Sequence, residues 1–99
     1  MLDIEPYKDA IATICRKLAI RKLELVGSAA REDFDQTHSD VDLLVEFEGN
    51  EVLFKRYFEL KKCLEELFGR EVDLIQEEAV KNPYVKQSID HDRIMIYAA

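Results

Sequence analysis

The sequence contains no long hydrophobic run. No segment approaches the roughly 20 consecutive apolar residues that a membrane-spanning helix requires, and the opening MLDIEPYKD is acidic and polar, unlike a secretory signal. We therefore expect a cytoplasmic protein. Repeats, linkers and low-complexity segments are also absent from the sequence, and its 99 residues fit one domain, 1–99, better than two independent cores.

Cysteine is scarce. Cys15 and Cys63 lack the C-x-x-C spacing of zinc and redox motifs, and two cysteines do not make the disulfide framework of a small secreted domain. Both fall on expected apolar helix faces. We expect buried, reduced thiols without a redox role.

Basic residues are outnumbered by acidic ones. There are 14 Lys and Arg against 21 Asp and Glu, which gives a formal net charge of -7. Nucleic-acid binding relies on Lys and Arg to displace counterions from phosphate, so direct binding of RNA or DNA is disfavoured. The same charge favours encounter with a basic protein, although it names no partner.

The spacing of apolar residues predicts a small α/β fold. The expected helices are 5–19, 52–68 and a short one from 82 to 88, and the expected strands are 22–26, 41–47, 71–75 and 93–97. Asp3 or Glu5 is the expected cap of the first helix, and Gly69 is the expected C-terminal cap of the second. Alternation of helices and strands predicts an α/β sandwich in which helices pack against one mixed sheet.

Three aspartates suggest a metal site. Asp40 and Asp42 stand two residues apart at the start of an expected strand, so their side chains share one face. Asp73 lies between two apolar strand residues, a poor place for an isolated charge. If the expected strands 41–47 and 71–75 pair, the three carboxylates form an oxygen-rich site suited to magnesium. The site requires no His or Cys, which argues against zinc.

A second group of residues suggests a phosphate site. Gly27 allows close approach of the backbone to an anion, and the Ser28 hydroxyl and helix N-terminal amides donate to phosphate oxygens. Ser28 is also expected to cap a helical turn, and Arg31 adds a positive charge. Residues 32–39 are expected to form a polar loop.

Each of these features also has a simple structural interpretation. Gly-Ser after a strand is commonly a turn, Asp-x-Asp at a strand end is often solvated, Asp73 suits an edge strand and Arg31 suits the surface. His38 and His91 are more readily solvated loop residues than ligands. The joint occurrence of the motifs in this order favours the functional interpretation.

The motifs resemble those of a known family. Gly27-Ser28-Ala29-Ala30-Arg31, then Ser39-Asp40-Val41-Asp42-Leu43-Leu44-Val45, then Val72-Asp73-Leu74, resemble the G-S-x-x-R, S-D-x-D-L-x-V and distal V-D-L signature of minimal nucleotidyltransferases in the DNA-polymerase-β-like superfamily. The resemblance covers nearly the whole chain. One departure is Glu32, which stands where the family commonly has Gly.

The resemblance implies a fold and an activity. The fold is the single-domain polymerase-β-like nucleotidyltransferase fold. Asp40, Asp42 and Asp73 hold two magnesium ions and serve catalysis, with Asp73 orienting or deprotonating the attacking hydroxyl, while Gly27, Ser28 and Arg31 bind the nucleotide. ATP is the implied substrate.

The resemblance also implies a partner. Family members of this size are similar to antitoxins paired with a HEPN-type toxin ribonuclease, and some transfer AMP from ATP to a tyrosine of that toxin. Two alternatives stay open. One is a subunit that neutralises the toxin by occlusion, which Glu32 favours because its carboxylate weakens triphosphate binding. The other is a subunit of a small-molecule nucleotidyltransferase.

Overall fold

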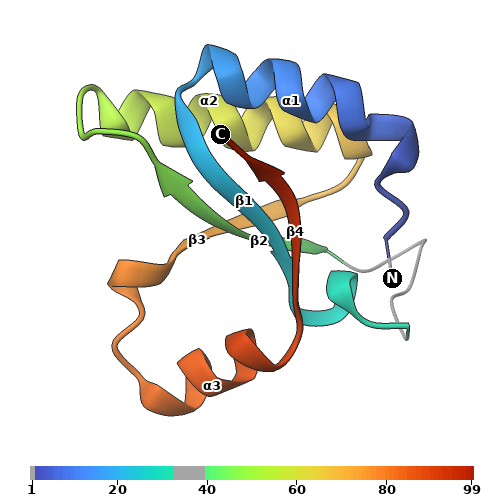
Figure 1. The fold of residues 1–99 in the computed structure, drawn as a ribbon, viewed down its shortest axis with the longest axis vertical. Helices are drawn as coiled ribbons and strands as arrows, with labels where there is room; N and C mark the ends of the chain where they lie inside the picture. Colours follow the sequence, from blue (N-terminus) through green and yellow to red (C-terminus); the bar gives the residue numbers. More distant parts are fainter. Residues whose placement is uncertain (1, 33–39) are drawn as a thin grey trace.

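A four-stranded mixed sheet organises the chain (Figure 1). The computed structural model describes residues 2–32 and 40–99, so most of the expected 32–39 loop, His38 and Ser39 included, lies outside the described residues. The strands are β1 (Ile20–Val26), β2 (Val41–Phe47), β3 (Val72–Gln76) and β4 (Arg93–Ala98). Their order is β3-β2-β1-β4, with β1 antiparallel to β2 and β4, and β2 parallel to β3. The predicted mixed α/β fold is confirmed.

The helices begin and end close to their predicted positions. The α-helices are α1 (Lys8–Lys17), α2 (Leu53–Phe68) and α3 (Pro83–His91), and the 3-10 turns are η1 (Glu5–Tyr7), η2 (Gly27–Ala30) and η3 (Glu77–Ala79). The Asp3 carboxylate accepts the Glu5 N–H at 3.2 Å, and Gly69 (φ +67°) donates its N–H to the Glu65 carbonyl. The prediction of Gly69 as a helix cap is confirmed, whereas the prediction of Asp3 or Glu5 as the cap of the first helix is wrong, because the N-cap positions are Ile4 for η1 and Tyr7 for α1 and no side chain caps either.

The first helix differs from its prediction at both ends. It opens with the 3-10 turn η1, and α1 ends at Lys17 rather than at residue 19. The reason at the C-terminal end is Ala19, whose φ of +53° lies in the left-handed region and turns the chain into β1. Apolar spacing carries no signal of such a reversal.

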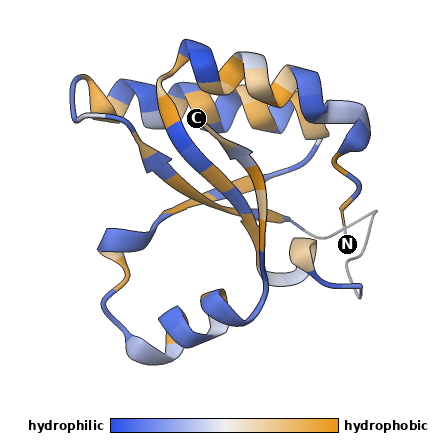
Figure 2. Cartoon of the chain, in the orientation of Figure 1, coloured by the Kyte–Doolittle hydropathy of each residue, from blue (hydrophilic) through white to orange (hydrophobic). Residues whose placement is uncertain are grey.

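The two faces of the sheet differ in composition and in cover: one is apolar, and the other carries polar side chains around a small apolar cluster. Figure 2 shows mainly apolar strands between helices with one apolar side. Leu23, Leu25 and Leu43 pack against α1 and α2 on one face in the main core. Val26 and Leu44 point to the other face, where Ile89 of α3 packs on them. Among the described residues, the second face is thus covered by the short helix α3 and by the segment around η3, which is less cover than α1 and α2 give the first face.

The two cysteines agree in part with the prediction that both are buried, reduced thiols. Both cysteines are free; Cys15 is fully buried, and burial raises the pKa of its thiol to about 12. Cys63 is only half-buried, because it lies at the margin of the α2 apolar face. Within the described part of the chain, no helix is long and apolar enough to cross a bilayer.

An ionic cluster joins β4 to the elements around it. The Arg93 guanidinium donates to both carboxylate oxygens of Glu24 at 2.9 Å, to Glu77 at 2.9 Å and to Asp90 at 2.6 Å. Glu24 is on β1 and its side chain is only 7% exposed. The cluster therefore ties β1, η3 and α3 to the start of β4.

We expect this cluster to make stability depend on pH. The hydrogen bond from Arg93 lowers the pKa of Glu24 against the opposing effect of burial. A lowered folded-state pKa contributes stability that is complete above the unfolded-state pKa and is lost as pH falls through the folded-state value. Glu24→Gln should therefore cost about 1 to 3 kcal/mol at pH 7, a cost that begins to shrink below the ordinary Glu pKa of about 4.3 and disappears only below the lowered folded-state pKa. Urea unfolding of both proteins at several pH values measures the difference, and a difference independent of pH would contradict the expectation.

Candidate functional site

Two of the predicted carboxylates meet on the less covered face of the sheet. The parallel register pairs Asp42 of β2 with Asp73 of β3, so both side chains point to the face that carries Val26 and Leu44. Asp42 is half-buried, whereas Asp73 and Asp40 are exposed. The predicted pairing of the two strands is confirmed, and with it the placement of Asp42 beside Asp73.

The pKa of Asp42 is shifted by the neighbouring aspartates. Its pKa is raised first by burial, then by the charge of Asp73, by a hydrogen bond with Asp73 and by the charge of Asp40. A hydrogen bond between two carboxyl groups needs a proton on one of them, because two carboxylates only accept. The three aspartates therefore favour either a shared proton or a cation.

The donor set fits a hard divalent cation. Carboxylate oxygens are the ligands that magnesium prefers, and it keeps water and phosphate in its remaining positions. In residues 2–32 and 40–99, no group of three or more His, Cys, Asp or Glu side chains is already close enough to hold an ion. Asp42 and Asp73 thus provide a contacting pair, and the charge of Asp40 acts on Asp42.

Gly27 lies directly against the carboxylate pair. It follows Val26, which pairs with Asp42 across β1 and β2, and its φ is +64°. A Cβ atom at this position would lie 2.9 Å from the Asp42 Oδ2 atom. Glycine is required here both for the backbone conformation and for the space that the Asp42 carboxylate occupies.

Gly27→Ala is expected to displace Asp42 and to lower activity at least about 100-fold. Gly49→Ala is the matched control, because Gly49 has a φ of +67° and a Cβ atom there would meet nothing within 4 Å. Both changes carry a backbone cost of about 1 kcal/mol, so any further loss reports on the carboxylate. Equal activity of the two variants, in the nucleotide transfer that the sequence motifs lead us to expect, would show that the contact with Asp42 is unimportant.

The Gly27-Ser28 turn matches its prediction in place but not in detail. Residues Gly27–Ala30 form the 3-10 turn η2, and no side chain caps it, since Ser28 lies inside the turn rather than before it. The prediction of Ser28 as a cap is therefore wrong. A turn of four residues also has little macrodipole, so any phosphate binding here rests on backbone N–H groups and the Ser28 hydroxyl.

Arg31 is engaged with the far end of α3. Its Nη1 atom lies 3.6 Å from Oδ2 of Asp92, and the same oxygen lies 3.2 Å from Nδ1 of His91. Asp92 was not singled out by the sequence, because an ion pair between residues far apart along the chain leaves no local pattern. His91 is exposed, as predicted, and Glu32 is exposed at the end of the described segment.

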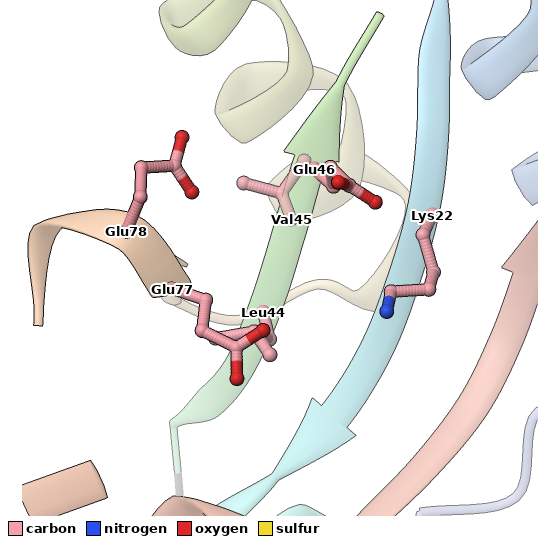
Figure 3. Close-up of a pocket in the computed structure, with 6 residues that line it drawn as sticks. All are labelled: Lys22, Leu44, Val45, Glu46, Glu77 and Glu78. Atoms are coloured by element: carbon pink, nitrogen blue, oxygen red, sulfur yellow. The ribbon is translucent and has the colours of Figure 1, made fainter.

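A pocket further along the same sheet face contains none of the predicted site residues. It is lined by Lys22, Leu44, Val45, Glu46, Glu77 and Glu78. Figure 3 shows Glu77 reaching from η3 over Leu44, with the Lys22 ammonium pointing in from β1. Three carboxylates against one ammonium make this pocket acidic, which disfavours a polyphosphate there.

Curated relatives share most of this chain. It is 42% identical over 81 residues to a candidate protein adenylyltransferase of Methanocaldococcus jannaschii. This alignment covers 81% of this chain and 80% of the relative. It is 36% identical over 90 residues to the protein adenylyltransferase MntA of Thermococcus cleftensis, covering 87% of this chain and 89% of the relative. The similarity therefore spans nearly the whole of both proteins.

Solved structures share the fold. One described as a candidate minimal nucleotidyltransferase is 29% identical, with a TM-score of 0.68 over 92% of this chain and 90% of the other. An MNT antitoxin complex with the tri-AMPylated HEPN toxin of Shewanella oneidensis matches with a TM-score of 0.59 over 93% of this chain and 70% of the other, at 16% identity. The second likeness, at this identity, concerns the fold alone.

The family match covers the site and both layers of the fold. Residues 8–96 match the family described as nucleotidyltransferase domain, which includes η2 and all three aspartates. The resemblance to minimal nucleotidyltransferases and the predicted enzyme class are confirmed. The chain belongs to the nucleotidyltransferase domain family.

Proposed function

We propose that this protein transfers AMP from ATP to a hydroxyl group of a partner protein, most specifically a tyrosine of a HEPN-type toxin ribonuclease, and so acts as its antitoxin. The observation that carries the proposal is the meeting of Asp42 and Asp73 in register on one sheet face, with the Gly27-Ser28 turn against Asp42. A paired carboxylate site beside a glycine-containing turn suits a nucleotide with its metal ions. Because the reaction consumes ATP, we place it in the cytoplasm.

The proposed roles follow from the chemistry of each side chain. Asp40, Asp42 and Asp73 would hold two magnesium ions, which supply positive charge to the entering oxygen and the leaving pyrophosphate. Backbone N–H groups of the Gly27-Ser28 turn and the Ser28 hydroxyl would donate to phosphate oxygens. Arg31 would contribute charge to the nucleotide in competition with Asp92, which it contacts in the structure.

The reaction is a displacement at the α-phosphorus of ATP. The acceptor oxygen forms a bond to that phosphorus while the bond to pyrophosphate breaks, and the hydroxyl proton passes to Asp73 and then to solvent. Asp73 suits this role because it is exposed, whereas Asp42 is half-buried. An acceptor therefore reaches Asp73 first.

The nature of the acceptor is inferred from the relatives. Both curated relatives are named for protein adenylylation and match nearly their whole length. The fold neighbour in complex with an AMPylated HEPN toxin supports a toxin as the acceptor. A net charge of -7 suits a protein partner better than a nucleic acid. AMP added near a ribonuclease site would repel RNA phosphate there.

A second function remains in competition. Glu32 is exposed beside Arg31, and a carboxylate near a triphosphate weakens its binding. A protein with a weak nucleotide site would neutralise the toxin by occlusion alone. The third possibility, a small-molecule nucleotidyltransferase subunit, needs a further domain to complete the acceptor pocket.

Position-specific labelling of ATP separates these functions. The protein is incubated with magnesium, a candidate HEPN-type partner, and ATP labelled at either the α- or the γ-phosphate. We expect label on the partner from α-labelled ATP only, because γ-phosphate leaves in pyrophosphate. Tight inhibition without label would favour occlusion. Label on the partner from γ-labelled ATP would show that the reaction is phosphorylation and not AMP transfer.

Ser28→Ala is expected to lower the rate of this labelling about 10-fold, which is a smaller loss than the one expected for Gly27→Ala. The hydroxyl supplies one hydrogen bond to phosphate, while the backbone amides of the turn remain. Initial rates at several ATP concentrations measure the effect. A loss as complete as that of an aspartate variant would assign Ser28 a larger role than phosphate binding.

A further inference from the structure

Asp73 lies on the least supported of the site strands. β3 is at the edge of the sheet and pairs only with β2, in the parallel arrangement, whereas β2 is held between β3 and β1. Edge strands carry free backbone N–H and C=O groups, and parallel pairing is slightly weaker per residue than antiparallel pairing. When Asp42 and Asp73 are both ionised, their repulsion also acts to push β3 away, by about 1 to 4 kcal/mol for charges about 4 Å apart.

Three side chains of α2 occupy the outer edge of β3. The Glu65 carboxylate accepts the Val72 N–H at 3.1 Å, and the Lys61 ammonium donates to the Val72 carbonyl at 2.5 Å. The Tyr57 hydroxyl donates to the Leu74 carbonyl at 2.9 Å. These side chains follow one another every four residues, on one side of the helix.

The bonded backbone groups flank Asp73 on both sides. Val41 donates its N–H to the Glu71 carbonyl, so residue 71 bonds to β2. Residues alternate along a strand, and the backbone groups of Val72 and Leu74 consequently point away from β2. Those are the groups that α2 binds. The residue between them, Asp73, is fixed in position along the strand by directional bonds that apolar packing alone does not supply.

The α2 side chains that bind β3 also stabilise one another. Lys61 and Glu65 form an ion pair at 3.4 Å, and each is about one-third exposed. The bond from the Val72 N–H is the first cause of a lowered pKa of Glu65, which keeps this carboxylate charged and able to accept. The contacts therefore favour one arrangement of helix and strand.

We propose that Tyr57, Lys61 and Glu65 form a clamp on the backbone edge of β3 that positions Asp73 for its role at the site. None of the three contacts the reacting groups, so they are positioning residues. The functional half of this inference rests on the proposed nucleotidyl transfer, whereas the structural half concerns β3 alone.

Substitutions at Glu65 test the clamp with an internal rescue. Glu65→Met removes the acceptor, whereas Glu65→Gln retains an oxygen that accepts from Val72. Glu66→Met is the matched control, because Glu66 is exposed on the same helix. Tyr57→Phe removes one hydroxyl and keeps the ring, so it should fold even if Glu65→Met does not.

Two readouts are needed. Hydrogen exchange of the β3 amides, measured without metal, should be about 10-fold faster in Glu65→Met and unchanged in Glu65→Gln and Glu66→Met. Affinity for Mn²⁺, measured by calorimetry, should fall about 10-fold in Glu65→Met and Tyr57→Phe, with recovery in Glu65→Gln. In AMP transfer the same variants should lose kcat while KM for ATP stays constant.

The outcomes distinguish the clamp from the proposed function. Unchanged exchange of β3, or equal losses in Glu65→Gln and Glu65→Met, would overturn the clamp. Faster exchange with unchanged Mn²⁺ affinity and kcat would also overturn it, because α2 would then hold β3 without positioning Asp73. A wild-type protein that binds no Mn²⁺ and transfers no AMP would count against the proposed function, and exchange alone would then decide whether β3 is clamped.

Discussion

Asp42→Asn is expected to lower AMP transfer by about 100- to 1000-fold while leaving the fold intact. Asn has the same shape as Asp but lacks the charge that the magnesium ions need. Asp42 is the central member of the site, because it contacts Asp73 and lies against Gly27, and because the charge of Asp40 contributes to its raised pKa. Initial rates of label transfer from α-labelled ATP measure the loss.

The same substitution should raise the melting temperature of the metal-free protein at pH 7. A carboxyl with a raised folded-state pKa is destabilising once ionised, so its cost appears as pH rises above the unfolded-state pKa and is complete above the folded-state one. Asn removes that cost.

The activity of this variant decides the role of Asp42. AMP transfer at a near wild-type rate, with the substitution verified by mass, would show that Asp42 is not a ligand of the metal ions.

Arg56→Met is expected to cost about 3 to 5 kcal/mol of the free energy of unfolding, out of the roughly 5 to 15 kcal/mol typical of a small domain. Arg56 is buried and donates to four backbone carbonyls at 2.8 to 2.9 Å, those of Leu18, Ala19, Glu48 and Glu51. Its guanidinium also lies 5.1 Å from the centre of the Phe47 ring. Without it, four carbonyls at the junction of α1, β2 and α2 lose a charged donor, and of these the Ala19 carbonyl still accepts the Glu48 N–H.

Arg56→Lys is the graded control for this prediction. An ammonium keeps the charge but cannot reach four carbonyls in the planar arrangement of a guanidinium, so an intermediate loss is expected. Urea unfolding of the three proteins measures the series. A cost below about 1 kcal/mol for Arg56→Met would mean that water replaces the guanidinium without difficulty.

Local sequence patterns predict the parts of this fold that are formed by neighbouring residues. The expected strand 41–47 coincides with β2, because a continuous apolar run indicates a buried central strand. Asn82 and Pro83 correctly mark the start of α3, where the Asn82 side chain accepts the Tyr84 N–H. The prediction that Asp42 and Asp73 share a face needed only strand periodicity and one pairing.

Contacts between distant parts of the chain are the features that sequence patterns do not reveal. Arg56 looks like any charged residue of an amphipathic helix, yet it is buried and donates to carbonyls of two other segments, residues 18–19 and 48–51. Arg31 looks like a phosphate ligand, yet it contacts Asp92. The α2 side chains that bind β3 are likewise ordinary Tyr, Lys and Glu until the sheet order makes β3 an edge.

The intact mass of the partner protein tests the central claim most directly. The HEPN-type partner is treated with this protein, ATP and magnesium, separated from it, weighed and then assayed for RNA cleavage. We expect the mass to rise by one AMP group or a whole number of them, and the separated partner to stay inactive because the added phosphate repels RNA. An unchanged mass, with cleavage restored on separation, would contradict AMP transfer and establish occlusion as the function.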